Sequence, residues 1–210
     1  FAIESHKKSL DAYLKGNFDN ELIPIDVNGE YTVKRDDGPR EPDIEKIKNL
    51  NSAFIEGGSV TAATSSPVSI GASAILITSQ EFAKDNNLSY RSEIISRSVV
   101  GVDWTRMGAG PLPATEKALI KAGLSMNDIE TIELNEAFAA QSLYVIEKGN
   151  WNKNIINING GSIALGHPLG CSGARIITTL INVMEQQNTN LGLATMCIGS
   201  GQGIATIIKR

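Results

Sequence analysis

The spacing of apolar and polar residues changes character at about residue 87. Over 2–15, apolar side chains recur among charges at roughly helical spacing, and Gly16 follows as a natural C-terminal stop, so we expect a surface helix there. Residues 17–58 are charged, show little pattern and are interrupted by glycine and proline. They predict a loop or excursion with one short helix over 44–50.

The next segment combines strand-like and small apolar residues. Residues 59–63 have strand character, and 71–78 form a small-then-apolar run that suits packing between layers. A buried helix and a buried strand fit 71–78 equally well. The polar pair Asn86 and Asn87 then separates this run from the rest, which predicts a boundary there.

Beyond that boundary, strand-like and helix-like segments alternate. We expect strands over 93–100, 129–134, 155–158, 193–198 and 204–208, and helices over 115–122, 136–147 and 174–186. Such alternation predicts an α/β protein in which helices cover a sheet.

Composition narrows the class of protein. The 210 residues are 41% hydrophobic and carry a net charge of −4, without the Lys/Arg cluster that nucleic-acid binding needs. No apolar run approaches the roughly 20 residues of a membrane span, and no signal pattern opens the chain. With only two cysteines, the chain cannot contain a framework of several disulfides, but a single disulfide is compatible with the sequence. Two reduced thiols in a cytosol-like compartment fit the sequence better than a disulfide does. Because the chain opens at Phe1 inside a helical pattern, we expect a segment upstream.

Three segments at predicted strand ends carry polar residues or glycines that packing alone does not require. The first is 133–141, where Asn135 lies at a transition from strand to helix. Taken alone, this asparagine fits a helix N-cap better than a side-chain amide aimed into a site.

The second segment, 157–175, holds five glycines around His167. So many glycines cost conformational entropy that a packing loop would not need, so something must approach this backbone closely. A histidine fixed between Gly166 and Pro168 can exchange a proton near neutral pH. The helix that follows could also hold an anion, but the Walker lysine and the Rossmann spacing are both missing.

The third segment, 195–203, places Cys197 at a strand end before a glycine-rich turn. A cysteine there is most often a small buried hydrophobic residue. The alternative is a thiol that gives or takes a proton, with the bare backbone N–H of Gly199 beside a developing oxyanion.

Taken together, Asn-Glu-Ala-Phe at 135–138, Gly-His-Pro at 166–168 and Cys-Ile-Gly-x-Gly at 197–201 resemble the C-terminal signature of thiolases. The resemblance covers the whole chain but only about the second half of a family chain. It implies the C-terminal half of a layered α/β/α/β/α thiolase fold. We then divide the chain into an excursion (1–57), the last elements of the N-terminal thiolase domain (58–86) and the C-terminal thiolase domain (87–210).

The resemblance also implies roles for single residues. The nucleophilic cysteine of thiolases would lie in the missing N-terminal half, and Cys171 would be structural. Cys197 would exchange the proton at the substrate α-carbon, and His167 would activate the nucleophile. Asn135 would hold a water beside the thioester oxygen, while the Gly199 N–H would help to hold the tetrahedral oxyanion.

Coenzyme A binding is implied for four residues. Ser66 matches the family serine that contacts the pantetheine, with Ala62, Phe54 and Ala137 as apolar neighbours. The loop departs from the family pattern at Ala63, which replaces a glycine, and at Ile70, which replaces an aspartate. Coenzyme A would be a substrate, and we expect neither a tightly bound cofactor nor a metal.

The implied activity is that of an acetyl-CoA C-acyltransferase. It would be thiolytic cleavage of 3-ketoacyl-CoA in fatty-acid β-oxidation or the reverse Claisen condensation. The sequence resembles the degradative thiolases more than the biosynthetic ones. Cys197 argues against the decarboxylating condensing enzymes, which use two histidines.

The resemblance further implies its own N-terminal half as a partner, a homodimer or homotetramer, and a multifunctional β-oxidation subunit as a further candidate partner. The expected location is cytoplasmic, or mitochondrial or peroxisomal in a eukaryote. We expect the 210-residue chain to be inactive by itself. The alternative is a non-catalytic module that binds acyl-CoA or serves in assembly.

Overall fold

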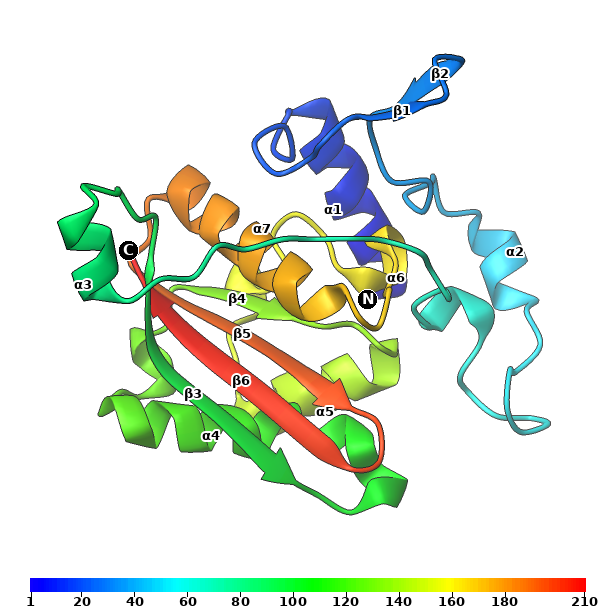
Figure 1. Ribbon diagram of the computed structural model, residues 1–210. Coiled ribbons are helices and arrows are strands. Elements are labelled where there is room, and N and C mark those ends of the chain that lie inside the picture. Colours follow the sequence, from blue (N-terminus) through cyan, green and yellow to red (C-terminus); the bar gives the residue numbers. More distant parts are fainter.

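A four-stranded mixed sheet forms the centre of the computed structural model, which describes residues 1–210 (Figure 1). The strands run in the order β3 (Glu93–Gly101), β6 (Gln202–Lys209), β5 (Leu191–Ile198), β4 (Thr131–Leu134). β6 is antiparallel to both of its neighbours, whereas β4 and β5 are parallel. A parallel pair needs a long crossover, and here the chain from 135 to 190 supplies it.

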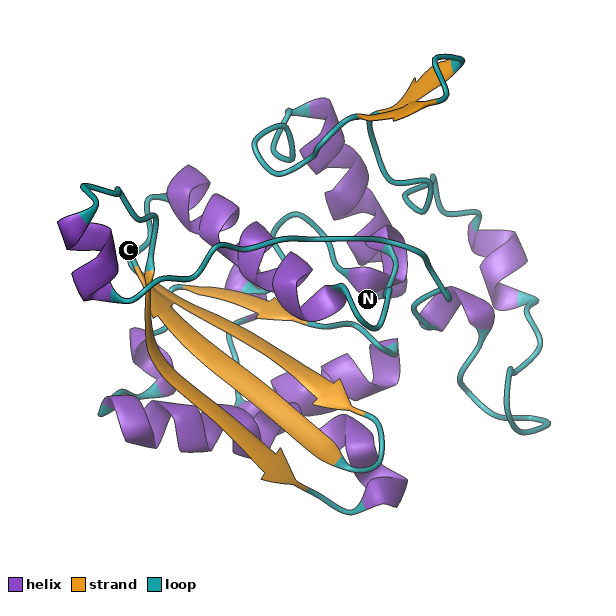
Figure 2. Cartoon of the chain, viewed as in Figure 1, coloured by secondary structure: helices purple, strands orange, loops and turns teal.

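Helices cover both faces of this sheet (Figures 1 and 2). One face packs on α4 (Pro111–Ala122) and α5 (Ala139–Gly149) around the larger core, which includes Ile132, Leu193 and Ile207. The other face packs on α7 (Ser172–Gln187) through a smaller core with Leu180, Ala194 and Ile208. Neighbouring strand residues therefore point to opposite cores, as the period of two in a strand requires.

The first helix, α1 (Ala2–Leu14), ends before Gly16 as predicted, with Gly16 at φ 71°. Its buried face is mainly polar and small, because Ser5, His6, Ser9 and Ala12 point inward while Leu14 is 88% exposed. The apolar positions of the sequence therefore do not mark the packed face of this helix. α1 instead packs closely against α6 (Ser162–Leu165) and the glycines that precede it.

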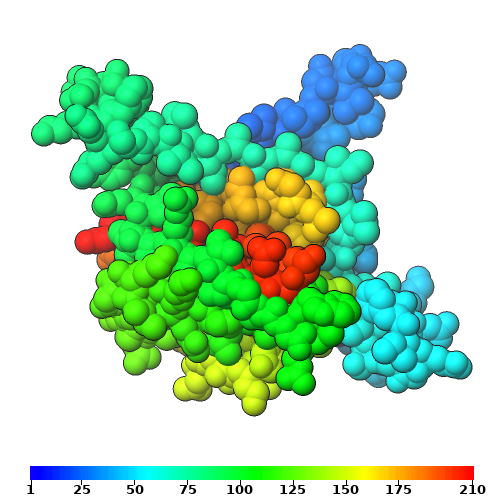
Figure 3. Space-filling view, turned by 60° about the horizontal axis from the view of Figure 1, so that its bottom comes forward, coloured from blue at the N-terminus to red at the C-terminus, as the bar shows by residue number.

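Residues 17–58 form the predicted excursion. It contains a hairpin of β1 (Ile25–Val27) and β2 (Tyr31–Val33), which the sequence did not predict, and the expected short helix, α2 (Ile44–Lys48). Both project from the body of the molecule (Figure 3). The unpredicted α3 (Gln80–Asp85) projects elsewhere, just before the expected boundary at Asn86 and Asn87.

Three sequence predictions in the less regular segments are wrong. Residues 59–63 form no strand, because Thr61 makes a single bridge to Ser52 and a 3-10 turn over Ala62–Thr64 follows. Residues 71–78 are neither a buried helix nor a buried strand. They run as an extended segment across the side of α7 that faces away from the sheet (Figure 1).

Residues 155–158 are also not a strand. Ile156 makes one parallel bridge to Ile132, after which Asn157 turns into the left-handed region at φ 46°. The Asn157 side chain bonds both the backbone N–H and the carbonyl of Leu134, each at 2.8 Å. The side chain thus replaces the ladder that a longer strand would make.

Candidate active site

Asn135 and His167 meet beyond the carboxyl end of β4. The Asn135 backbone N–H donates to Thr195 O on the parallel strand β5 at 3.0 Å, which fixes where the side chain leaves the sheet. His167 reaches the same point from the loop after α6, where Gly166 turns with φ 96°. Asn135 Nδ2 and His167 Nε2 lie 3.3 Å apart. Asn135 does not cap a helix, because the N-cap of α5 is Phe138.

The environment keeps the imidazole of His167 uncharged at neutral pH. Burial lowers the pKa of His167 below 6.5, and the nearby positive charge of Arg175 lowers it further. An uncharged imidazole with a free ring nitrogen can accept a proton.

Cys197 lies at the same edge of the sheet, two residues beyond Thr195 on β5. It is buried and free, and burial raises the pKa of its thiol above 9.0, so the thiol stays protonated at neutral pH. No hydrogen bond joins Cys197 to His167 or Asn135. Gly199 lies in the exposed turn between β5 and β6, with open space where a side chain would begin.

Of the four residues implied for coenzyme A, the structure joins Ser66 and Ala137 directly. Ser66 donates to Ala137 O from both its backbone N–H, at 3.0 Å, and its hydroxyl, at 3.2 Å. Phe54 is 72% exposed and makes an edge contact with Phe138, next to Ala137, with ring centroids 6.0 Å apart. Ala62 is exposed and begins the 3-10 turn that ends at Thr64, two residues before Ser66.

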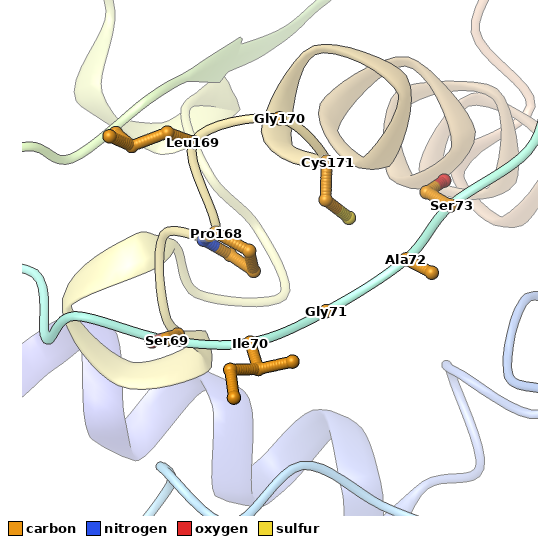
Figure 4. A pocket seen from close by; sticks show the side chains of 9 residues that line it. All are labelled: Ser69, Ile70, Gly71, Ala72, Ser73, Pro168, Leu169, Gly170 and Cys171. Carbon is orange, nitrogen blue, oxygen red and sulfur yellow. The ribbon is translucent and has the colours of Figure 1, made fainter.

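An open hollow of about 470 Å³ begins directly after His167 in the chain (Figure 4). It lies between the extended segment 69–73 and the turn 168–171. Cys171 lines it, with its sulfur directed toward the extended segment (Figure 4). Burial raises the pKa of the Cys171 thiol, which is unlike the lowered pKa of an activated nucleophile.

Sequence reasoning assigned no role to the polar residues that surround the Asn135–His167 pair. Ser162 donates to Asn135 Oδ1 at 2.6 Å, and Arg175 donates to Ser162 Oγ at 2.9 Å. Ser172 Oγ lies 2.6 Å from His167 Nδ1. Ser172 and Arg175 lie three residues apart, which places both on one face of α7. This spacing was the feature of the sequence that could have pointed to them.

No group of three or more His, Cys, Asp and Glu side chains is arranged to hold a metal ion. None of the helices combines the length and the apolar character needed to cross a membrane.

Comparison with protein families gives two matches that together cover most of the chain. The description "Thiolase, C-terminal domain" matches residues 88–210, and "Thiolase, N-terminal domain" matches residues 1–81.

Curated relatives give the same result along the whole chain. A 3-ketoacyl-CoA thiolase of Acinetobacter baumannii strain AYE is 56% identical over an alignment of 218 positions, which covers 100% of this chain and 56% of the relative. The 3-ketoacyl-CoA thiolase of Psychrobacter cryohalolentis is 54% identical with the same coverage. The chain thus spans a little over half the length of these relatives.

Solved structures confirm the thiolase-like α/β fold. The acetyl-CoA acetyltransferase of Bacillus anthracis superposes with a TM-score of 0.94 at 38% identity, over 99% of this chain and 54% of that one. Human mitochondrial 3-ketoacyl-CoA thiolase in complex with CoA superposes with a TM-score of 0.92 at 36% identity, over 99% of this chain and 53% of that one.

Proposed function

Since this chain belongs to the thiolase family, we propose that it supplies the acid–base half of an acetyl-CoA C-acyltransferase that cleaves 3-ketoacyl-CoA. The nucleophilic cysteine would come from an N-terminal thiolase half. The observation that carries the proposal is the hydrogen-bonding contact of 3.3 Å between Asn135 and His167, whose positions 32 residues apart in sequence converge at one strand end.

The pKa values around this pair suit acid–base chemistry at neutral pH. The lowered pKa of His167 makes it a neutral base, and the raised pKa of Cys197 keeps a proton ready to give. Two groups whose environments move their pKa values apart are a common arrangement for separate acid and base roles.

The cleavage would proceed in two steps. His167 would take the proton of the nucleophilic thiol, whose sulfur attacks the 3-keto carbon. The bond between the α-carbon and that carbon then breaks, its electron pair forms the enolate of acetyl-CoA, and Cys197 gives the α-carbon a proton. The proton that His167 took would restore the Cys197 thiol. His167 would then take the proton of a coenzyme A thiol, whose sulfur attacks the acyl-enzyme, and return it to the departing nucleophile as an acyl-CoA shortened by two carbons is released.

Backbone and amide groups would stabilise the charges in these steps. Asn135, through a water, and His167 would hold the thioester oxygen of the enolate, and the Gly199 N–H would help to hold the tetrahedral oxyanion. The exposed position of Gly199 leaves its backbone accessible to a substrate.

Coenzyme A would lie against the contact between Ser66 and Ala137. Phe54, which contacts the neighbouring Phe138, and Ala62, four residues before Ser66, are both exposed and would offer apolar surface to the pantetheine. We further propose that the domains span 1–57, 58–86 and 87–210. The protein would form a homodimer or homotetramer and would be cytoplasmic. A β-oxidation multifunctional subunit is the candidate heterologous partner.

A chimera tests this function. The part of the Acinetobacter baumannii relative that this chain does not cover would be joined ahead of Phe1, and thiolysis of a 3-ketoacyl-CoA would be followed. We expect turnover that falls by about 10² or more in His167→Ala, the size of a lost general base. A folded chimera that binds acyl-CoA without turnover would instead establish the non-catalytic module.

A further inference from the structure

We propose that Arg175 and Ser162 are positioning residues that fix the side-chain amide of Asn135 and, through it, the tautomer of His167. These two residues thereby decide which ring nitrogen of His167 carries the proton. Its use in catalysis rests on the proposed function, but the tautomer itself can be measured without any activity.

The directions of the hydrogen bonds begin at Arg175, which can only donate. Its Nη2 donates to Ser162 Oγ at 2.9 Å, so that oxygen is an acceptor in this contact. Ser162 is fully buried, and its hydroxyl has one other partner, Asn135 Oδ1 at 2.6 Å. The hydroxyl proton must therefore point at Asn135, because a buried donor without an acceptor is costly.

This contact decides the orientation of the Asn135 amide. Its oxygen faces Ser162, so its NH₂ group faces His167 and donates to Nε2 across 3.3 Å. An imidazole nitrogen that accepts a hydrogen bond carries no proton, and the proton of the neutral ring then lies on Nδ1.

The other side of the ring agrees with this assignment. His167 Nδ1 lies 2.6 Å from Ser172 Oγ, and Ser172 Oγ lies 3.0 Å from the carbonyl oxygen of Pro168. A carbonyl can only accept, so Ser172 donates to Pro168 and accepts from Nδ1–H. One consistent series of donors and acceptors thus runs from Arg175 to Pro168.

The consequence is a base with its lone pair on the correct nitrogen. Nε2 carries no proton and faces Asn135, where the substrate oxygen and the nucleophile of the proposed reaction would meet, so its lone pair can accept a proton in place of the Asn135 N–H. The opposite tautomer would place N–H there and remove that base. Arg175 also lowers the pKa of His167, which keeps the ring uncharged.

His6 supplies an internal reference, since the chain has only two histidines. The backbone N–H of Arg40 donates to His6 Nδ1 at 3.4 Å, so in neutral His6 the proton lies on Nε2. Burial lowers the pKa of His6 as well, so both rings are neutral at about pH 8. The two histidines should therefore show opposite tautomers in one sample.

The test is a long-range ¹H–¹⁵N correlation spectrum of the 210-residue chain with ¹⁵N-labelled histidine at about pH 8, because the nitrogen shifts distinguish N–H from bare nitrogen. We expect His167 to be mainly protonated on Nδ1 and His6 mainly on Nε2. A His167 ring protonated mainly on Nε2 would overturn the proposal, whatever the thiolase assay shows.

Variants separate positioning from general structure. In Ser162→Ala the amide of Asn135 loses its orienting donor, and we expect the Nδ1–H to Nε2–H ratio of His167 to fall several-fold while His6 is unchanged. Arg175→Lys keeps a donor and should keep the ratio. Ser96→Ala removes another buried hydroxyl, one that bonds Ala118 O, and should not change His167. An unchanged His167 in folded Ser162→Ala would overturn the role of Ser162.

Discussion

Glu21 and Glu133 place two carboxyl groups in poorly solvated positions near Arg175. Burial raises the pKa of Glu21 to about 7, against the opposing effects of Arg175 and the Thr179 hydroxyl. Burial also raises the pKa of Glu133 to about 8, although Arg175 Nη1 lies 3.7 Å from its carboxylate. One oxygen of each acid, Glu21 Oε2 and Glu133 Oε1, is buried without a hydrogen-bond partner.

Glu21 makes a stability prediction with a definite sign. Because its folded pKa is raised from 4.5 to about 7, the folded state binds the proton more tightly than the unfolded chain does. The stabilisation is present below about pH 4.5 and is lost as the pH rises through about 7. Glu21→Gln should therefore be more stable than the wild type at pH 8, by on the order of 1 kcal/mol, and should match it at pH 4. Urea unfolding at both pH values measures this.

Glu185 serves as a control of the opposite sign. Two hydrogen bonds from Arg91, at 2.8 and 2.6 Å, lower the pKa of Glu185. Its contribution is present above its ordinary pKa and is lost on acidification. Glu185→Gln should thus lower stability at pH 8. A fall in stability of Glu21→Gln at pH 8 would contradict the account of Glu21.

Among the site residues, those within short motifs could be predicted from sequence. Asn135 and His167 each lie in such a motif, and the structure joins them. The hydrogen bonds of Ser162 with Asn135 and Arg175 could not be predicted, because each joins elements that only folding brings together.

At the scale of elements, α1 packs on α6 through glycines and a buried carboxylate. Ser5 Oγ donates to Glu136 Oε2 at 2.6 Å and accepts from the Gly161 N–H at 3.0 Å. A side chain at Gly161 would collide with the Glu136 carboxylate, and one at Gly160 would collide with Ser9 and the Ser5 carbonyl of α1. The close approach explains why the buried face of α1 carries serine and alanine.

We predict that Gly161→Ala destabilises the chain by about 1–3 kcal/mol, the usual cost of overpacking a filled site. Gly173→Ala is the matched control, because Gly173 is an exposed helix position in α7 with open space around it. It should be neutral or stabilising by up to about 1 kcal/mol. Thermal unfolding compares the two, and equal midpoints would disprove the close packing at Gly161.

The pattern predicted elements best where their partners lie in this chain. β3, α4, β5, β6 and α7 follow their predicted ranges because each packs into one of the two cores. The prediction for residues 71–78 was wrong for a physical reason. An extended apolar segment needs neighbouring strands to become part of a sheet, and no strand of this chain pairs with it.

At the scale of the whole molecule, one side is well packed and the other carries exposed apolar residues. Val68 and Ile70 are fully exposed, and Leu76 is 87% exposed. The four-stranded sheet is covered on both faces. The outer side of α7, by contrast, is covered mainly by the extended segment that contains residues 71–78 (Figure 1). The thiolase-like fold was predicted from three motifs, but the position of this segment depends on contacts that no motif records.

In the proposed function, this chain carries the proton-transfer chemistry of carbon–carbon bond cleavage, with Cys197 as the acid. The most direct test measures two rates in the chimera described above: acyl transfer from an acyl-CoA to the enzyme, and cleavage of a 3-ketoacyl-CoA. We predict that Cys197→Ala leaves acyl transfer within about twofold and slows cleavage by about 10² or more, while Cys171→Ala changes neither rate. Equal loss of both rates in Cys197→Ala, or loss of cleavage in Cys171→Ala, would contradict the claim.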